Sequence, residues 1–210
     1  MPGKASSRYQ IDYGRLLAGR EHCSTQQKAE MLLKQLPDLW RAAYLKMTPR
    51  QTEIFFVRHG SFQYMFDHPM HAAPSVASSQ PACESRLVVA FGWSKRQLGG
   101  RDDFRLKGWV GPTEKTFGLE WDKGHFIGHS IGGTVDQCEL NVFVQRRDLN
   151  RGWSPSGKRY RRLERYCFRN PGTFCFSRPI YLDGSSMPAM LEFGILKTTG
   201  ELVVELFDNS

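Results

Sequence analysis

The sequence predicts a single α+β domain built on an antiparallel sheet, and three observations lead to this prediction. The chain has 210 residues, 40% of them hydrophobic, which suffices for one substantial core and is too little for several domains. An early segment has helical apolar spacing, and short strand-like runs follow it. The last two of these runs are joined through a hairpin turn, which is typical of antiparallel pairing.

The first predicted element is helical and runs from residue 24 to residue 47. Its apolar side chains recur every three or four residues: Ala29, Leu32, Leu33, Leu36, Leu39, Trp40 and Ala43. Pro37 lies within the segment, where proline removes a backbone donor and clashes with the preceding turn. The pattern therefore predicts either two short helices or one kinked helix.

Two strand-like segments come next. Residues 54–66 form an aromatic stretch, and residues 86–93 are almost entirely apolar. Between them, residues 68–84 are rich in Pro, Ala and Ser and predict a surface loop. Glycine and charge dominate residues 99–118, which predicts connecting structure. We expect residues 1–95 to form an N-terminal extension, with a helical start and then strands, within the same domain.

The second half begins with residues 120–145, where repeated glycines predict a loop with one short apolar segment. Each glycine disfavours a helix by roughly 1 kcal/mol relative to alanine. A basic helix is expected around residues 160–166. Strand-like runs then follow at residues 174–182, 190–196 and 202–207, the last two joined through Thr199 and Gly200.

Positive charge is concentrated in one segment of the chain. The formal net charge is +8, and residues 145–169 hold nine basic against two acidic residues, a local net charge of +7. The basic residues are Arg146, Arg147, Arg151, Lys158, Arg159, Arg161, Arg162, Arg165 and Arg169. A solvated helix face normally mixes both signs, so a cluster of one sign favours a polyanionic partner such as a phosphate backbone.

Cysteine usage and hydropathy limit the class of protein. There are five cysteines, an odd number with no C-x-x-C pair, which argues against a zinc ribbon and against a full disulfide framework. Reduced structural thiols are expected, and the sequence also allows one disulfide. No apolar run reaches the length of a membrane span, and the start of the chain lacks the apolar stretch of a secretory signal. We therefore expect a soluble protein made in the cytoplasm.

Five short motifs occur in a fixed order in the second half of the chain. They are Asp122-Lys123-Gly124-His125, Gly132-Gly133, the pair Asn141 and Gln145, Asn150-Arg151-Gly152, and Leu163-Glu164. This ordered set resembles the DNA/RNA non-specific endonuclease family, whose nuclease core is of the ββα-metal (His-Me finger) type. The form of the motifs around His125 and Asn150 is similar to the bacterial toxin branch of that family. The resemblance places the nuclease core in residues 96–210.

The resemblance implies a role for each motif residue. His125 would be the general base, a role suited to an imidazole whose unperturbed pKa is about 6.5. Asn150 would be the only direct protein ligand of Mg²⁺, which prefers oxygen ligands and keeps several waters; Mn²⁺ could substitute. Glu164 would hold metal-bound waters, and Asn141 and Gln145 would orient the histidine or the substrate.

The remaining implications concern the substrate and the biological role. Lys123 stands where the family commonly has arginine, and it keeps the charge but loses the bidentate phosphate fork. The residues expected to contact nucleic acid are Arg146, Arg147, Arg151, Arg161 and Arg165. The substrate would be DNA, RNA or both, with little base specificity. Resemblance to the toxin branch implies an antibacterial effector that is exported by a specialised secretion route and inhibited by an immunity protein.

Several alternatives stay open from the residues alone. The chain could be a non-enzymatic nucleic-acid-binding protein that uses residues 145–169. His125 and His129 have the spacing of a zinc pair on a helix, but the glycines around them argue against a shared helical face. His125 could also be a buried structural histidine and Asn150 a helix cap. A structural or surface role is expected for His59.

Overall fold

The computed structural model describes residues 10–48, 52–69, 85–99, 113–133 and 139–210. Within these residues the fold is α+β with antiparallel sheets, as the sequence predicted. The larger sheet has six strands in the order β1-β2-β3-β6-β7-β8, with every neighbouring pair antiparallel. Its strands are β1 (Thr52–His59), β2 (Phe62–Pro69), β3 (Arg86–Trp93), β6 (Phe174–Ile180), β7 (Met190–Leu196) and β8 (Leu202–Asp208).

A second sheet and five α-helices complete the described elements. The second sheet pairs β4 (Trp121–His125) with β5 (Val142–Arg146). The helices are α1 (Tyr13–Leu17), α2 (Thr25–Leu45), α3 (Thr113–Phe117), α4 (Arg147–Arg151) and α5 (Pro155–Arg169), with short 3₁₀ helices η3 (His129–Ile131) and η4 (Glu139–Asn141). None of the described helices is long and apolar enough to cross a membrane.

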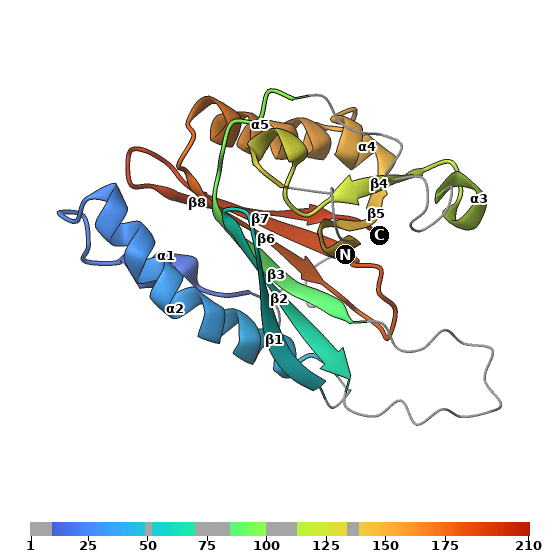
Figure 1. Ribbon diagram of the computed structural model, residues 1–210, viewed down its shortest axis with the longest axis horizontal. Helices are drawn as coiled ribbons and strands as arrows, with labels where there is room; N and C mark the ends of the chain where they lie inside the picture. Colours follow the sequence, from blue (N-terminus) through green and yellow to red (C-terminus); the bar gives the residue numbers. More distant parts are fainter. Residues whose placement is uncertain (1–9, 49–51, 70–84, 100–112, 134–138) are drawn as a thin grey trace.

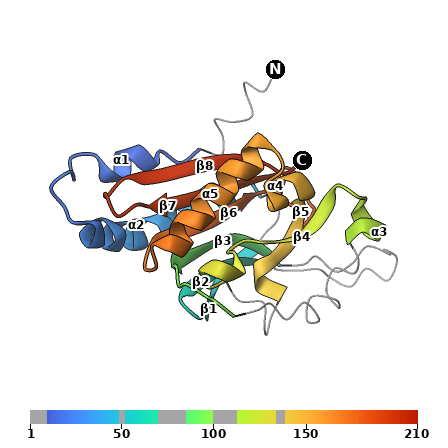
Figure 2. The same ribbon diagram turned by 90° about the horizontal axis from the view of Figure 1, so that it is seen from above.

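Strands from both halves of the chain form the large sheet. β3 pairs with β6, so residues of the expected N-terminal extension lie beside residues of the expected nuclease core. α1 and α2 cover one face of this sheet, whereas α5 and the β4–β5 pair lie over the other face (Figure 1). Seen from above, α5 lies across β6 and β7 (Figure 2). The boundary drawn at residue 95 stays a prediction from the sequence.

α2 is one continuous helix, so the prediction of two short helices is wrong. Ser24 and Gln27 form a capping box at its start: the Ser24 hydroxyl accepts from the Gln27 backbone N–H at 3.2 Å, and the Gln27 side chain accepts from the Ser24 N–H at 2.9 Å. Pro37 lies inside the helix and does not divide it. The buried side chains of Leu32, Leu36 and Trp40 anchor both halves of the helix to the sheet.

A buried hydrogen-bonded group fastens α1 and α2 to the sheet. The Tyr13 hydroxyl donates to the Glu192 carboxylate, and Trp40 Nε1 donates to the Tyr13 hydroxyl at 3.0 Å. Arg178 Nε donates to the same carboxylate at 2.6 Å. Burial, reinforced by the negative charge of Glu192, raises the pKa of the Tyr13 hydroxyl well above its usual range. The hydroxyl therefore stays protonated as a donor.

Two stretches of the chain contain strands that the sequence did not separate or did not predict. Residues 54–66 do not form one strand: β1 ends at His59 and β2 begins at Phe62, because the chain turns at Gly60, whose φ is +61°. The glycine-rich stretch 120–145 is not only loop, because β4 and β5 occupy its two ends. The expected strand at 86–93 and the hairpin joining β7 to β8 are confirmed.

Some predicted features lie wholly or partly outside the described residues. The predicted loop at residues 68–84 and the connecting segment at 99–118 both fall largely there. Of the five cysteines, Cys83 and Cys138 also lie outside them, whereas Cys23, Cys167 and Cys175 are free thiols.

Candidate active site

The predicted site residues lie on a strand pair and on the helices that follow it. β4 and β5 are antiparallel, with Asp122 opposite Gln145 and His125 opposite Val142. α4, which carries Asn150, begins directly after β5, and α5, which carries Glu164, comes next. The motifs, which are dispersed along the sequence, are therefore brought to one side of the molecule, over the α5 face of the large sheet (Figure 2).

His125 ends β4 and is buried, with its Nε2 atom enclosed by protein. The Tyr160 hydroxyl of α5 approaches the His125 backbone carbonyl at 3.5 Å. The ring of the next residue, Phe126, stacks on Phe143 of β5 with the ring centroids 4.3 Å apart. The backbone of the histidine is thus held between the strand pair and α5.

Asn141 holds the segment that follows His125. Its side-chain oxygen accepts from the Ile127 backbone N–H at 2.9 Å, and its side-chain nitrogen donates to the Ile127 carbonyl at 2.8 Å. This pair of bonds imitates a strand pairing and engages both ends of the amide. Asn141 therefore contacts the backbone two residues after His125, and its side chain is already bonded to Ile127.

Gly124 and Gln145 fit together directly beside the histidine. A Cβ atom at Gly124 would lie 2.2 Å from the Gln145 Oε1 atom, far inside contact distance. Gln145 itself is buried. The glycine of the motif is thus required by the close approach of this amide, which packs against the backbone immediately before His125.

Asp122 organises the side chains around Asn150. Its carboxylate accepts from Arg151 Nε at 2.7 Å, from Arg147 Nε at 2.9 Å and from Asn150 Nδ2 at 3.2 Å. Burial acts to raise the pKa of Asp122, but the bonds from Arg151, Asn150 and Arg147 outweigh it and lower the pKa below its ordinary value. Because a carboxylate only accepts, Asn150 must present its nitrogen to Asp122, which turns its amide oxygen away.

Glu164 lies against the loop that follows His125. A Cβ atom at Gly128 would stand 2.5 Å from Glu164 Oε1, so the carboxylate packs directly on this loop. Arg161 Nη1 donates to Glu164 Oε2 at 3.1 Å. The Glu164 side chain is buried, and its carboxylate lies beside the segment that follows His125.

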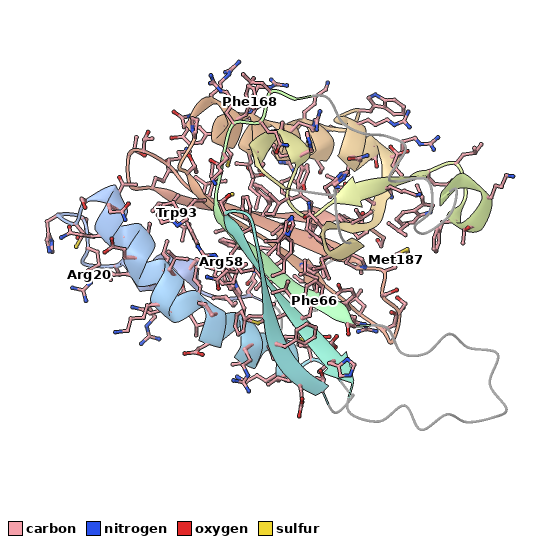
Figure 3. All side chains as sticks on the ribbon, in the orientation of Figure 1. Arg20, Arg58, Phe66, Trp93, Phe168 and Met187 are labelled. Atoms are coloured by element: carbon pink, nitrogen blue, oxygen red, sulfur yellow. The ribbon has the colours of Figure 1, made fainter. Side chains whose placement is uncertain are left out.

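The arginines expected to contact nucleic acid divide into two groups. Four of them are in ion pairs: Arg146 with Asp148, Arg147 and Arg151 with Asp122, and Arg161 with Glu164. Arg165 is exposed on α5, as are Lys158, Arg162 and Arg169. Nitrogen-bearing side chains project outward over α5 in Figure 3, near the labelled Phe168. The outer face of α5 is therefore a continuous basic surface.

Lys123 lies on β4 between Asp122 and Gly124 and is half-buried. Loss of solvent around its ammonium group lowers its pKa from the usual lysine range. The structure thus places the lysine on the strand that ends at His125.

Sequence reasoning missed two residues here. Asp122 was part of the first motif but received no role, because nothing in the sequence shows that three donors converge on it. Trp153, in the turn between α4 and α5, is 62% exposed, and the Arg151 guanidinium carbon lies 5.0 Å from its ring centre. An exposed indole beside arginine is a surface on which a nucleobase can stack.

The described residues contain no group of three His, Cys, Asp or Glu side chains that could hold a metal ion. A structural zinc site needs such a group. A magnesium site built on one amide and several waters does not, because oxygen ligands can come largely from water. The oxygen donors at this site are the Asn150 amide and the Glu164 carboxylate, and both suit a hard divalent cation.

No protein-family model matches the chain, and no curated protein matches its sequence. Among solved structures, an extracellular endonuclease aligns over 79% of this chain and 83% of its own chain, with 13% sequence identity and a TM-score of 0.37. A similarity at this level supports no inference about function.

Proposed function

We propose that this chain is a metal-dependent nuclease that hydrolyses phosphodiester bonds of DNA or RNA with little sequence specificity. The observation that carries the proposal is the Asp122 cluster: a carboxylate on the strand that ends at His125 fixes the Asn150 amide with its oxygen turned away. This arrangement would supply the two groups that a ββα-metal nuclease needs, a base and an oxygen ligand. The antibacterial role, the immunity protein and the export route stay predictions from the sequence.

The donor set fits a divalent cation such as Mg²⁺ or Mn²⁺. Asn150 would hold it through the amide oxygen, and Glu164 would hold its waters. When bound, the cation supplies positive charge that stabilises the negative charge developing on the phosphate and on the leaving oxygen. Asp122 keeps the Asn150 amide in the orientation that this role requires.

His125 would take the proton from the attacking water. The ring is buried, and its Nε2 atom is enclosed by protein. Tyr160 and Asn141 hold the backbone at and after His125, by bonds to the His125 carbonyl and to Ile127. A base held in one position contributes roughly 10²- to 10⁴-fold in rate.

The outer face of α5 would bind the phosphate backbone of the substrate. Its exposed cations, Arg162 and Arg165 among them, offer charge without any base-reading arrangement. Contacts to phosphates position a nucleic acid but carry no sequence information. Low base specificity follows because the exposed side chains on this face are cations that contact phosphates.

Cleavage of supercoiled plasmid with and without Mg²⁺ tests the proposal. His125→Ala should lower the rate by roughly 10²-fold or more while circular dichroism and plasmid binding stay unchanged. His59→Ala, a histidine on β1 at the far edge of the large sheet, is the matched control and should cleave as the wild type does. If His125→Ala cleaves within about threefold of wild type, His125 is not the base. If the wild type binds plasmid but never cleaves it, the chain is a nucleic-acid-binding protein only.

A further inference from the structure

A cavity of about 220 Å³ lies on the α2 face of the large sheet, away from the candidate active site. The C-terminal half of α2, the start of β3, and the end of β6 with the loop after it form its walls. Residues 182–184 of that loop line the cavity and are exposed, so it reaches the surface there. Its volume is several times the roughly 30 Å³ that one water molecule takes in the liquid.

The cavity is lined by a buried guanidinium with few hydrogen-bond partners. Arg86 is only 3% exposed, and among the described residues its side chain makes one hydrogen bond, from Nη2 to the Asp183 carbonyl at 2.9 Å. Its Nε atom is buried without a hydrogen-bond partner. The Tyr181 ring lies 4.7 Å from the guanidinium carbon. A guanidinium has five N–H donors, so most of its bonding capacity remains.

Each neighbouring carboxylate already has partners of its own. Asp67, across the strand pair, accepts from the Arg86 backbone N–H and from the Tyr44 hydroxyl. Asp183 accepts from the Ser185 backbone N–H at 2.8 Å and from the Ser185 hydroxyl at 2.6 Å.

The other arginine of the cavity differs from Arg86. Arg178 is paired with Glu192 at 2.6 Å, whereas among the described residues Arg86 has no acidic side chain within ion-pair distance. Buried charges in proteins are normally paired, so Arg86 is an exception that a ligand would explain.

The remaining walls define the shape of that ligand. Trp40, Val88 and Ile180 give an apolar lining, and the buried Thr48 hydroxyl has no hydrogen-bond partner among the described residues. We propose that this cavity binds a small organic anion, whose carboxylate or phosphate group bonds to Arg86 and whose apolar body lies against these walls. Arginine recognises either group through paired N–H donors.

This proposal is independent of the proposed nuclease activity. The cavity and the Asp122 cluster lie on opposite faces of the large sheet, and no residue belongs to both. A binding measurement with the full chain therefore tests the cavity alone, whatever the outcome of the cleavage assay.

Calorimetric titration with phenyl phosphate and with benzoate tests the site, and benzyl alcohol serves as the neutral probe. At least one anion should bind with a stoichiometry of one, and benzyl alcohol should bind at least roughly tenfold more weakly. Arg86→Met removes the charge and should weaken anion binding by roughly tenfold or more. Ala43→Leu fills the cavity from α2 while leaving Arg86 in place, and it should weaken binding by the same order, so the test does not depend on Arg86→Met folding.

Arg162→Gln, on the outer face of α5, is the control for unspecific attraction to a basic protein and should bind the anion as the wild type does. Absence of binding by both anions would overturn the proposal. So would equal binding of benzyl alcohol, or anion binding that survives both cavity variants. Binding lost in Arg162→Gln would also overturn it, by placing the anion on α5.

Discussion

Asp122 is the residue through which the candidate site is assembled. It accepts from three side chains of the short helix α4, and it decides which end of the Asn150 amide points outward. It would touch neither substrate nor metal, so it is a positioning residue. Groups that orient a metal ligand in this way typically contribute 10- to 100-fold to metal affinity or activity.

Asp122→Asn should therefore raise the Mg²⁺ concentration for half-maximal cleavage by roughly 10- to 100-fold. An amide at this position can donate, so it no longer forces Asn150 to present its nitrogen. The measurement is the Mg²⁺ dependence of plasmid cleavage, with thermal unfolding measured in parallel. Glu205→Gln, which removes a half-buried carboxylate paired with Arg159 on α5, should leave the Mg²⁺ dependence unchanged. An unchanged Mg²⁺ requirement in Asp122→Asn would show that Asp122 only stabilises the fold.

At the residue scale, the sequence predicted which residues gather at the candidate site better than it predicted what each side chain does there. The ordered motifs singled out the residues that cluster on β4, β5, α4 and α5, but they did not show how those side chains pair. Arg147 and Arg151 were predicted to contact nucleic acid, yet both are bonded to Asp122. A charge count cannot distinguish a cation facing solvent from one held by a carboxylate distant in the sequence.

Among the elements, α5 has two faces of different character. Tyr160 and Leu163 face the sheet and are buried in the core, whereas Arg162 and Arg165 point to solvent. Arg159 and Arg161 are already paired with carboxylates. The electrostatic attraction of α5 for a polyanion should therefore come mainly from its exposed cations that lack such a pair.

Replacing Arg162 and Arg165 with Gln should weaken nucleic-acid binding and flatten its salt dependence. Each lost phosphate contact lowers the slope of log K against log salt by roughly one unit. The matched control replaces Lys34 and Arg41 with Gln, which removes the same charge from exposed positions on α2, across the sheet. Equal slopes for the two double variants would mean that net charge, and not the α5 surface, attracts the substrate.

The sequence predicted elements well where one period ran without interruption. β3 was found from its continuous apolar run, the hairpin of β7 and β8 from its turn, and the helix at residues 160–166 from its concentrated charge. The turn at Gly60 was missed because aromatic residues continue on both sides of it. β4 was read as loop because the Gly124 backbone is needed for close packing with Gln145, which local propensity does not reveal.

For the whole molecule, the attachment of the small sheet to the large one depends on the C-terminal segment. The fully buried Asn209 side chain accepts from the Arg146 N–H at 2.8 Å. It also donates to the carbonyls of Val144 at 3.1 Å and Pro188 at 2.7 Å. One amide thus joins β5 to the loop before β7. Nothing in the sequence marks this residue, because its partners become neighbours only in the folded chain.

Asn209→Ala should lower the free energy of unfolding by roughly 2–5 kcal/mol, because it leaves three buried backbone groups without partners. Urea unfolding measures this loss. Ser210→Ala, at the exposed next position, should change the free energy by less than about 0.5 kcal/mol. A similarly small change in Asn209→Ala would mean that other contacts hold the two sheets together.

The account of the whole molecule depends most on Asn150 as the metal ligand, and the metal dependence of plasmid cleavage tests it most directly. We expect cleavage to stop in EDTA and to return with Mg²⁺ or Mn²⁺, since both accept oxygen-rich sites. Asn150→Ala should lower the rate by several orders of magnitude, and Asn150→Asp should retain more activity because a carboxylate oxygen can still reach the cation. Full activity of Asn150→Ala at limiting Mg²⁺, or cleavage that persists in EDTA, would contradict the account.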